Sequence, residues 1–444
     1  MPRRIVIIGG GVAGINTMEE IMKLDPDARI TTIKKERIAS FSTCGMIYAL
    51  HGTYPLSECI LQEKEAYIEK DIDFRSETTV TGINCDENYI AIGDEKIPYD
   101  YLVIATGRKQ KIPPIAGTDL EGVYRYSNEE DAAEILEVLD QVENAVIIGA
   151  GIIGLQAANA FADRGIRTTV VEALPSLLPT MLDSDMAEIV QNKLEEAGIR
   201  FIMGEFVQSI DGKERVVSVS VKAEKISADM VVLAAGMQPN IDLALDAGIE
   251  IGEFGGILTD TALRVKRKRG YLENVYALGD CIEVIDGVTN RPRLSMLAST
   301  AVIQARLVAN NICGKNKIYN PVLSPAVTVL GGLQVGSVGI TSEMAKRYGI
   351  DIIIGKSKKL TRARYYPGRK PITLKLIFDH NRKLIGAQAV SEETVPGRID
   401  AFTIAISKGL TVDELVEMER CFEPALSFLT DVTIDAARDA ISRM

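Results

Sequence analysis

The sequence predicts an α/β protein that contains two Rossmann-like units, each a parallel sheet covered by helices. The pattern G-x-G-x-x-G occurs twice, from Gly9 to Gly14 and from Gly149 to Gly154. Each copy lies between an apolar run typical of a buried strand and a run with helical spacing, and this context gives the pattern its meaning. With 444 residues the chain is too long for one ordinary core, so we expect two or three domains.

The composition is typical of a soluble globular protein, with 46% hydrophobic residues, 25% charged residues and a formal charge of −11. An acidic chain is a poor partner for nucleic acid, and the one basic run, Arg264–Arg269, is predicted to be a solvated turn. The uncharged stretch Ala145–Ala162 contains the second glycine pattern, which explains it better than a membrane span. The run Ile5–Ile8 is too short for a signal peptide.

The six cysteines form no CxxC pair and no zinc-like cluster. We therefore expect no metal site and a reducing, cytoplasmic location.

The first glycine pattern is flanked as a nucleotide site should be. The expected order is strand, turn, helix and strand, over Arg4–Ile8, Gly9–Gly14, Ile15–Leu24 and Arg29–Ile33. Backbone amides of such a turn and the following helix N-terminus stabilise a pyrophosphate. A ribose-binding carboxylate is expected about twenty residues after the turn, but the chain has Lys34, Lys35 and then Glu36 there. The acid is thus missing or displaced, and the lysines are expected to face either solvent or a phosphate.

The second glycine pattern has the same surroundings. The expected elements are two strands and the helix between them, over Ala145–Ile148, Thr168–Val171 and Leu155–Arg164. Here an acid, Glu172, follows Gly154 by 18 residues and no arginine comes directly after it. A carboxylate would repel a ribose 2′-phosphate, so this site is predicted to prefer NADH over NADPH.

Three further stretches complete a recognisable order of motifs, namely YLVIATG, VVLAAGMQPN and VYALGDC, over Tyr101–Gly107, Val231–Asn240 and Val275–Cys281. Together with the two glycine turns they closely resemble the FAD-dependent pyridine nucleotide–disulfide oxidoreductases. The resemblance implies that the NAD-binding domain is inserted in the FAD-binding domain and that an α+β dimerisation domain follows, making a homodimer. The domains implied are 1–118 with 244–318 for FAD, 119–243 for NAD and 319–444 for dimerisation.

One cysteine lies where this family places its redox sulfur. Glutathione-reductase-like members carry two cysteines four residues apart, whereas this chain has only Cys44, in SFSTCGMIY. The sequence thus resembles the single-cysteine branch of coenzyme A-disulfide reductases, NADH oxidases and persulfide or polysulfide reductases. Ser42 and Thr43 are good N-cap residues, so a helix is expected to begin there and to stabilise the Cys44 thiolate with its positive end. The alternative is a buried apolar cysteine.

The resemblance also implies which other residues serve the reaction. Tyrosines of the partner subunit approach the redox cysteine in the coenzyme A branch; one matches Tyr365 or Tyr366, and Phe422 occupies the place of the other, without its hydroxyl. Predicted cofactor contacts are Gly9, Gly11, Val12, Ala13, Gly14, Lys34, Lys35, Ser42, Val80, Thr106, Gly107, Gly149, Gly151, Ile152, Ile153, Gly154, Glu172, Gly236, Gly279, Asp280, Ala298 and Thr300.

Several positions depart from the family pattern. Val12 and Ala13 stand where oxidases and peroxidases often carry a histidine, which favours sulfur substrates. Ile152 replaces a tyrosine that commonly covers the flavin, and Gln156 replaces a glutamate. A basic pair that helps relatives bind coenzyme A appears as Met22–Lys23, which weakens the case for a phosphate-rich substrate.

The leading hypothesis is an FAD-dependent NADH oxidoreductase that reduces a low-molecular-weight disulfide, persulfide or polysulfide through Cys44. The rival is an NADH oxidase that reduces oxygen through a Cys44 sulfenic acid. A third hypothesis is a flavin-bearing redox sensor or electron donor to a protein partner. Cys421 is either a resolving thiol or, preferably, a buried structural cysteine; Cys281 is expected to pack, and the remaining cysteines lie in no motif.

Overall fold

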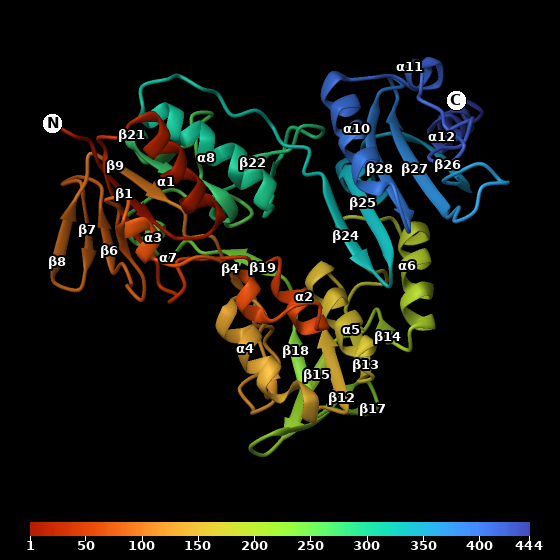
Figure 1. Cartoon of the computed structure of the whole chain (residues 1–444), viewed down its shortest axis with the longest axis horizontal. Coiled ribbons are helices and arrows are strands. Elements are labelled where there is room, and N and C mark those ends of the chain that lie inside the picture. Colours follow the sequence, from red (N-terminus) through yellow and green to blue (C-terminus); the bar gives the residue numbers. More distant parts are fainter.

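The computed structural model describes residues 1–444 and has three lobes (Figure 1). The first lobe is built on a six-stranded sheet of order β20-β21-β9-β1-β2-β5, in which only β20 is antiparallel to its neighbour. Helices α1 (Val12–Leu24) and α8 (Ala298–Ile312) pack together in this lobe. The strands are β1 (Arg4–Ile8), β2 (Arg29–Ile33), β5 (Asp73–Arg75), β9 (Tyr101–Ile104), β20 (Arg264–Arg267) and β21 (Gly270–Ala277).

Smaller elements complete the first lobe. A meander of three antiparallel strands flanks the sheet, and short helices and strands lie in its connections. They are β6 (Gly82–Asn84), β7 (Tyr89–Ile92), β8 (Glu95–Pro98), α3 (Glu65–Ile68), α7 (Asp242–Asp246), β3 (Ser40–Phe41), β4 (Ile60–Gln62), β22 (Val284–Ile285) and β23 (Pro292–Arg293).

The second lobe is inserted between β9 and β20 of the first. Its five-stranded parallel sheet has the order β11-β18-β12-β13-β14, and a three-stranded antiparallel sheet packs on it. A ribbon of β10 (Arg108–Gln110) and β19 (Met237–Pro239) joins the two lobes. The other elements are β11 (Val123–Tyr124), α4 (Glu129–Val138), β12 (Asn144–Ile148), α5 (Ile152–Asp163), β13 (Arg167–Glu172), α6 (Ser184–Glu196), β14 (Arg200–Met203), β15 (Val207–Gly212), β16 (Val216–Val221), β17 (Glu224–Ser227) and β18 (Met230–Leu233).

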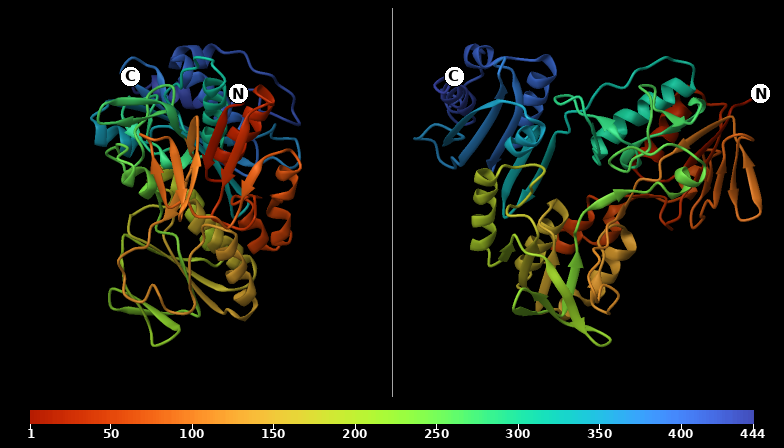
Figure 2. Two further views of the ribbon diagram at one scale, coloured as in Figure 1. Left: turned by 90° about the vertical axis from the view of Figure 1, so that its left-hand side faces the viewer. Right: turned by 180° about the vertical axis from the view of Figure 1, so that it is seen from behind.

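The third lobe is an α+β unit with a five-stranded antiparallel sheet of order β24-β25-β28-β27-β26. The two termini lie in different lobes, the N-terminus in the first and the C-terminus in the third (Figure 2). The elements of the third lobe are β24 (Ala326–Leu330), β25 (Leu333–Gly339), α9 (Ser342–Tyr348), β26 (Ile352–Leu360), β27 (Pro371–Asp379), β28 (Leu384–Ser391), α10 (Val395–Lys408), α11 (Val412–Glu417) and α12 (Val432–Ile441).

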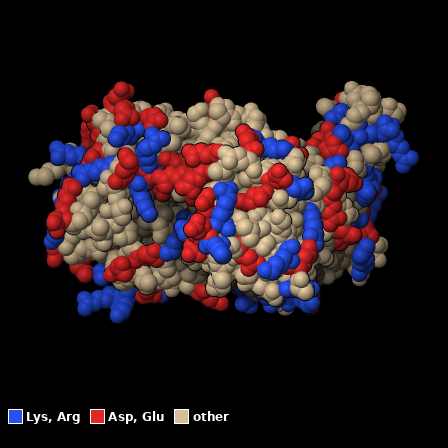
Figure 3. Space-filling view, turned by 90° about the horizontal axis from the view of Figure 1, so that it is seen from below, with Lys and Arg blue, Asp and Glu red and all other residues tan.

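The predicted fold class is confirmed, because a Rossmann-like unit is inserted in another and an α+β unit follows. The residue limits predicted for the three domains stay predictions. The prediction of a solvated turn at Arg264–Arg269 was wrong for its first part: Arg264–Arg267 form strand β20, paired with β21, and only Lys268 and Arg269 lie in an exposed turn. The charges of β20 are neutralised, since Arg264 pairs with Asp260 and Arg267 with Asp86. Figure 3 shows positive and negative side chains interspersed over one face of the molecule.

The second and third lobes share one hydrophobic core. Leu330, Leu333 and Val390 of the third lobe are buried in the same cluster as the side chains that line α5 and α6. At its edge Lys375 of β27 forms ion pairs with Asp183 (2.9 Å) and Asp185 (2.8 Å) at the start of α6. The first lobe has a separate core. No helix is both long and apolar enough to cross a bilayer.

Candidate active site

The first glycine turn is shaped by tight packing against β9. Gly9 has a φ of +115°, and a Cβ added there would overlap the carbonyl oxygen of Ala105. A Cβ at Gly14 would overlap the carbonyl of Gly9, so these two positions require glycine. Gly11 differs, because a Cβ there would meet no atom within 4 Å. The turn is therefore closed towards the sheet and open in front of the N-terminus of α1, as a dinucleotide pyrophosphate needs.

The second glycine turn repeats this geometry. Gly149 has a φ of +114° and is packed against Ala234, whereas Gly151 faces open space. Ile152 and Ile153 are the first residues of α5 and are half-buried. Two equivalent turns in two sheets fit two dinucleotide cofactors.

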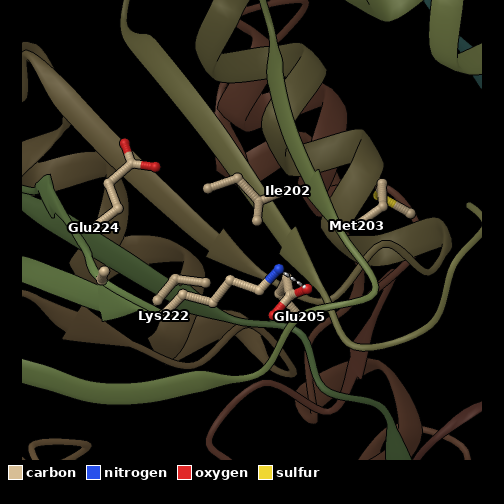
Figure 4. Close-up of a pocket in the computed structure, with 7 residues that line it drawn as sticks. Ile202, Met203, Glu205, Lys222 and Glu224 are labelled. Carbon is tan, nitrogen blue, oxygen red and sulfur yellow. Dashed lines mark ion pairs between the residues drawn. The ribbon is translucent and has the colours of Figure 1, made fainter.

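Glu172 ends β13 beside the second turn. Its carboxylate accepts hydrogen bonds from the backbone N–H of Ala150 (2.6 Å) and of Leu174 (2.8 Å). The acid is thus held at the strand end where a ribose would bind. The backbone of Glu172 also accepts a hydrogen bond from the N–H of Glu205 (3.0 Å), and Glu205 lines a cavity of about 480 Å³ that Glu172 itself does not line. Figure 4 shows Lys222 reaching across this cavity to Glu205; the lining residues are Ile202, Met203, Glu205, Val221, Lys222, Ala223 and Glu224.

Polar groups gather where β9 and β21 end in the first lobe. Gly279 has a φ of +82° and lies against α1, because a Cβ there would come within 2.9 Å of the Ala13 side chain. Asp280 follows it and pairs with Arg108 at 3.1 Å. Burial raises the pKa of Asp280, and the positive charge of Arg108 opposes that rise. Arg108 directly follows the YLVIATG motif, so its position could have been noted from the sequence.

The residues predicted to contact a cofactor where β9 and β21 end differ in their hydrogen bonds and in the space around them. Thr106 donates its hydroxyl to the carbonyl of Asn240 (2.6 Å), which ties the two connecting segments together. Gly107 (φ +68°) precedes β10 and Gly236 (φ +99°) precedes β19, at opposite ends of the antiparallel ribbon, and a Cβ at either position would meet no atom within 4 Å.

At the N-terminus of α8, Ala298 is exposed and Thr300 shares a hydrogen bond with Ser295 at 2.9 Å. Val80 is buried in the core of the first lobe.

Cys44 is exposed, which contradicts the alternative of a buried apolar cysteine. It lies in a turn before the short helix α2 (Met46–His51), whose N-cap is Gly45. The expectation that Ser42 or Thr43 caps a helix beginning there is wrong. Gly45 donates its N–H to the carbonyl and hydroxyl oxygens of Ser42 (3.0 and 3.2 Å), so the chain makes a turn first and the helix starts later.

The turn that carries Cys44 rests on polar and apolar contacts. Tyr54 donates its hydroxyl to the carbonyl of Gly45 at 3.0 Å, and the buried thiol of Cys59 lies beside both. Tyr126 is buried behind this group, and burial raises the pKa of its hydroxyl. Tyr54 lies in no motif, so reasoning from the sequence did not single it out.

Helix α2 is fixed to α5 rather than to the first sheet. Its apolar residues Met46, Ile47 and Leu50 are buried in the core of the second lobe. Arg164 donates Nε–H to the carbonyl of Leu50 (2.6 Å), and His51 lies 2.8 Å from Asp163. The turn that carries Cys44 is therefore attached to the helix that follows the second glycine turn (Figure 1).

Lys34 and Lys35 separate in the structure. Lys35 is exposed, as expected for a lysine that faces solvent. Lys34 is only 8% exposed, and its side chain lies against Gly10 of the first glycine turn. The expectation that Lys34 faces solvent is therefore wrong, and the alternative that it faces a phosphate stays a prediction.

Residues predicted to act from the partner lie elsewhere. Tyr365 and Tyr366 are exposed in the β26–β27 connection of the third lobe, which lies away from α2 (Figure 1). Phe422 and Cys421 are exposed in the segment between α11 and α12, so the preferred alternative of a buried Cys421 is wrong for the single chain. One chain does not bring these side chains to Cys44.

The remaining sequence candidates have local partners. Cys281 is fully buried and packs, with its sulfur 3.2 Å from the carbonyl of Leu278. Gln156 donates its side-chain N–H to Thr328 of the third lobe (3.1 Å). At the two positions where relatives carry a basic pair, Met22 packs on the core of the first lobe and Lys23 pairs with Glu20.

Comparison with known proteins places the chain among oxidoreductases. The family model described as pyridine nucleotide-disulphide oxidoreductase matches residues 3–305, and the dimerisation domain of the same family matches residues 325–432. A relative named NADH oxidase, from Methanocaldococcus jannaschii, is 40% identical and is aligned over 99% of both chains. A relative from Pyrococcus horikoshii, named NAD(P)H coenzyme A polysulfide/persulfide reductase, is 32% identical over 99% of this chain and 98% of its own.

Solved structures show the same arrangement. A NAD-dependent persulfide reductase from A. fulgidus superposes with a TM-score of 0.95 at 34% identity, covering 99% of this chain and 83% of that one. The Bacillus anthracis CoADR-RHD structure gives a TM-score of 0.94 at 28% identity, covering 100% of this chain and 80% of that one.

Proposed function

Because the chain belongs to the pyridine nucleotide-disulphide oxidoreductase family, and so is an enzyme that uses FAD and NAD(P)H, we propose that it reduces sulfur substrates through Cys44. The substrate class is a low-molecular-weight disulfide, a persulfide or polysulfide. The observation that carries the proposal is the exposed Cys44 thiol, held in a turn with no second cysteine four residues away. The relatives named for sulfur, polysulfide and persulfide reduction support this substrate class.

The residues present fit both cofactors. Open space in front of Gly11 and Gly151 leaves room for a pyrophosphate at each turn, and Glu172 would hold the NADH ribose. Bound FAD would supply two-electron transfer between the nicotinamide and sulfur. Asp280 would accept hydrogen bonds from the flavin's ribityl hydroxyls, and Arg108 would hold its carboxylate in place.

Cys44 performs the sulfur step. Its thiolate attacks one sulfur of the substrate, the substrate's S–S bond breaks, and the second sulfur leaves as a thiolate or a shortened polysulfide. The product on the enzyme is a mixed disulfide or persulfide of Cys44. Two electrons and a proton then restore the Cys44 thiol and release the bound group. Tyr54 and Ser42 keep the turn fixed during this exchange by their bonds to Gly45.

We propose further that the enzyme works as a homodimer in a reducing, cytoplasmic compartment. The dimerisation domain supports the dimer, and exposed Tyr366 and Phe422 are proposed to approach Cys44 of the other subunit. Coenzyme A is proposed as one carrier of the reducible sulfur, because one relative is named a CoA-dependent NAD(P)H sulfur oxidoreductase and another an NAD(P)H coenzyme A polysulfide/persulfide reductase.

The test is an anaerobic NADH titration of wild type and Cys44→Ser with sodium polysulfide, coenzyme A disulfide and, in a separate aerobic run, oxygen. Wild type should oxidise NADH rapidly only with a sulfur acceptor, and Cys44→Ser should lose that turnover. Equal turnover of both proteins with sulfur acceptors would contradict the assigned role of Cys44.

An NADH oxidase is the second candidate, and the 40% identical relative with that name favours it. Rapid NADH oxidation with oxygen alone, accompanied by a Cys44 sulfenic acid, would select this candidate. Slow turnover with every small acceptor would instead select an electron donor or redox sensor that acts on a protein partner.

A further inference from the structure

The first glycine turn has a buried pair of opposite charges where a single carboxylate was expected. The pair is Lys34, at the end of β2, and Glu129, the first residue of α4 in the inserted lobe. Lys34 is 8% exposed and Glu129 is 7% exposed. Buried charges are costly unless they are paired and hydrogen-bonded, so the arrangement needs a physical reason.

Lys34 lies directly against the glycine turn. A Cβ at Gly10 would come within 2.7 Å of the Lys34 Cδ, so the aliphatic part of the side chain covers the turn. Its ammonium donates to the carbonyl of Ile38 (2.7 Å) and makes no other hydrogen bond within the chain. Burial lowers the pKa of Lys34, and the negative charges of Glu36 and Glu129 oppose that change. An ammonium has three donors, so two of them remain available.

Glu129 reaches the same place from the second lobe. Its Oε1 accepts a long hydrogen bond from the N–H of Ile38 (3.3 Å). Burial raises the pKa of Glu129, and Lys34 is among the positive charges that oppose the rise. A carboxylate has about four acceptor positions, and here the chain fills one of them.

The two side chains interact through space but form no direct ion pair. Lys34 donors and Glu129 acceptors are thus both left without a partner in the chain, although each residue as a whole is more than nine-tenths buried. A vicinal diol complements them, because one hydroxyl can donate to the carboxylate while another accepts from the ammonium. The adenosine ribose of a dinucleotide carries such a diol and binds at this end of a Rossmann-like turn.

We propose that Glu129, supplied by the inserted lobe, is the acid that binds the adenosine ribose of FAD, and that Lys34 completes the contact as a donor. The displaced carboxylate then comes from a residue 95 positions away in the chain instead of from the end of β2. The proposal rests on FAD binding at the first turn and does not depend on the sulfur chemistry of Cys44.

The experiment measures flavin affinity and not turnover. Apo-protein of wild type, Glu129→Gln and Lys34→Met is titrated with FAD and with an FAD analogue that lacks the adenosine 2′-hydroxyl, and quenching of flavin fluorescence gives Kd. Wild type should bind the analogue about tenfold more weakly than FAD, since a hydrogen bond to a charged group is lost. Glu129→Gln should bind FAD about tenfold more weakly than wild type and should no longer distinguish the two ligands.

A matched control excludes a general effect of charge. Glu130→Gln alters the exposed neighbour of Glu129 on the same helix and should keep wild-type affinity and discrimination. If Glu129→Gln folds poorly, the FAD affinity of Lys34→Met tests the same site, and it should be lower than that of wild type. Thermal unfolding of each apo-protein shows whether the variant is folded.

Two results would overturn the proposal. Full discrimination between FAD and the analogue in folded Glu129→Gln would show that Glu129 only holds the Ile38 loop. Loss of discrimination in Glu36→Gln, with Glu129→Gln unaffected, would move the ribose contact to the half-exposed acid near the end of β2.

Discussion

The buried ion pair between the second and third lobes gives a sharp stability prediction. Lys375 and Asp183 are 7% and 6% exposed, and their side chains lie 2.9 Å apart. In Lys375→Met the Asp183 carboxylate loses its buried cation. It keeps three other donors, the N–H and hydroxyl of Ser342 and the side chain of Gln388. Removing one partner of a buried pair typically costs 3–5 kcal/mol, and the remaining donors place the expected loss at the lower end, about 3 kcal/mol.

Lys356→Met is the matched control. Lys356 pairs with Asp185 at 2.6 Å in the same cluster, but the two side chains are 35% and 42% exposed. Exposed pairs contribute about 0–1 kcal/mol, so this variant should lose little. For a unit of roughly 200 residues or more, about 3 kcal/mol corresponds to a fall in Tm of about 5–10 °C, against about 3 °C or less for the control.

The assay is thermal unfolding followed by circular dichroism, with flavin fluorescence as a separate report on the first lobe. The circular dichroism transition should shift for Lys375→Met and much less for Lys356→Met. Equal shifts in the two variants would refute the reasoning, because burial would then have no influence on the cost of losing the cation.

Two further predictions concern the site, and a third concerns Asp431, the N-cap residue of α12 in the third lobe. Tyr54→Phe removes the donor to the Gly45 carbonyl, so turnover with polysulfide should fall several-fold while the free energy of unfolding falls by about 1 kcal/mol; steady-state kinetics and urea unfolding measure the two effects. Glu172→Ala should raise the KM for NADH tenfold or more and reduce the preference over NADPH, as comparison of kcat/KM for the two nucleotides will show. Burial alone would raise the pKa of Asp431, but the hydrogen bonds and the positive charge of Arg398 outweigh burial and lower the pKa to about 2. A carboxylate with a lowered pKa in the folded state stabilises above its unfolded pKa of about 3.8 and loses that contribution as pH falls towards 2, so Asp431→Asn should cost about 2 kcal/mol at pH 7 and clearly less at pH 3 in urea unfolding.

Local patterns carried much of the fold prediction. The strands predicted at Arg4–Ile8 and Arg29–Ile33 have those bounds in the structure. The first is an apolar run after Arg4, typical of a buried parallel strand, and the second, RITTI, consists of β-branched residues after Arg29. The two glycine turns were equally readable, since the backbone there cannot accept a Cβ. Both features show as local patterns, the strands as short runs between turn residues and the turns as the spacing of their glycines, although the atoms that exclude a Cβ at Gly9 and Gly149 belong to the distant residues Ala105 and Ala234.

Features that depend on distant contacts were missed. Arg264–Arg267 is charged like a turn but pairs with β21, and the partner strand decides its structure. The helix after Cys44 starts at Met46 because Ser42 bonds to Gly45, a choice that capping preferences alone do not resolve. Glu129 lies in another domain from the turn it approaches, so no spacing rule reaches it.

The packing of α2 has a mechanical consequence. By chain order Cys44 belongs to the lobe that carries the first glycine turn, yet its helix is anchored in the body formed by the other two lobes. Under the proposed function, with FAD at the first glycine turn and NADH at the second, the Cys44 thiol would move with the NADH-binding body if the first lobe shifted about the β10–β19 ribbon. The distance between flavin and sulfur would then depend on how the two bodies are placed, and not on one side chain.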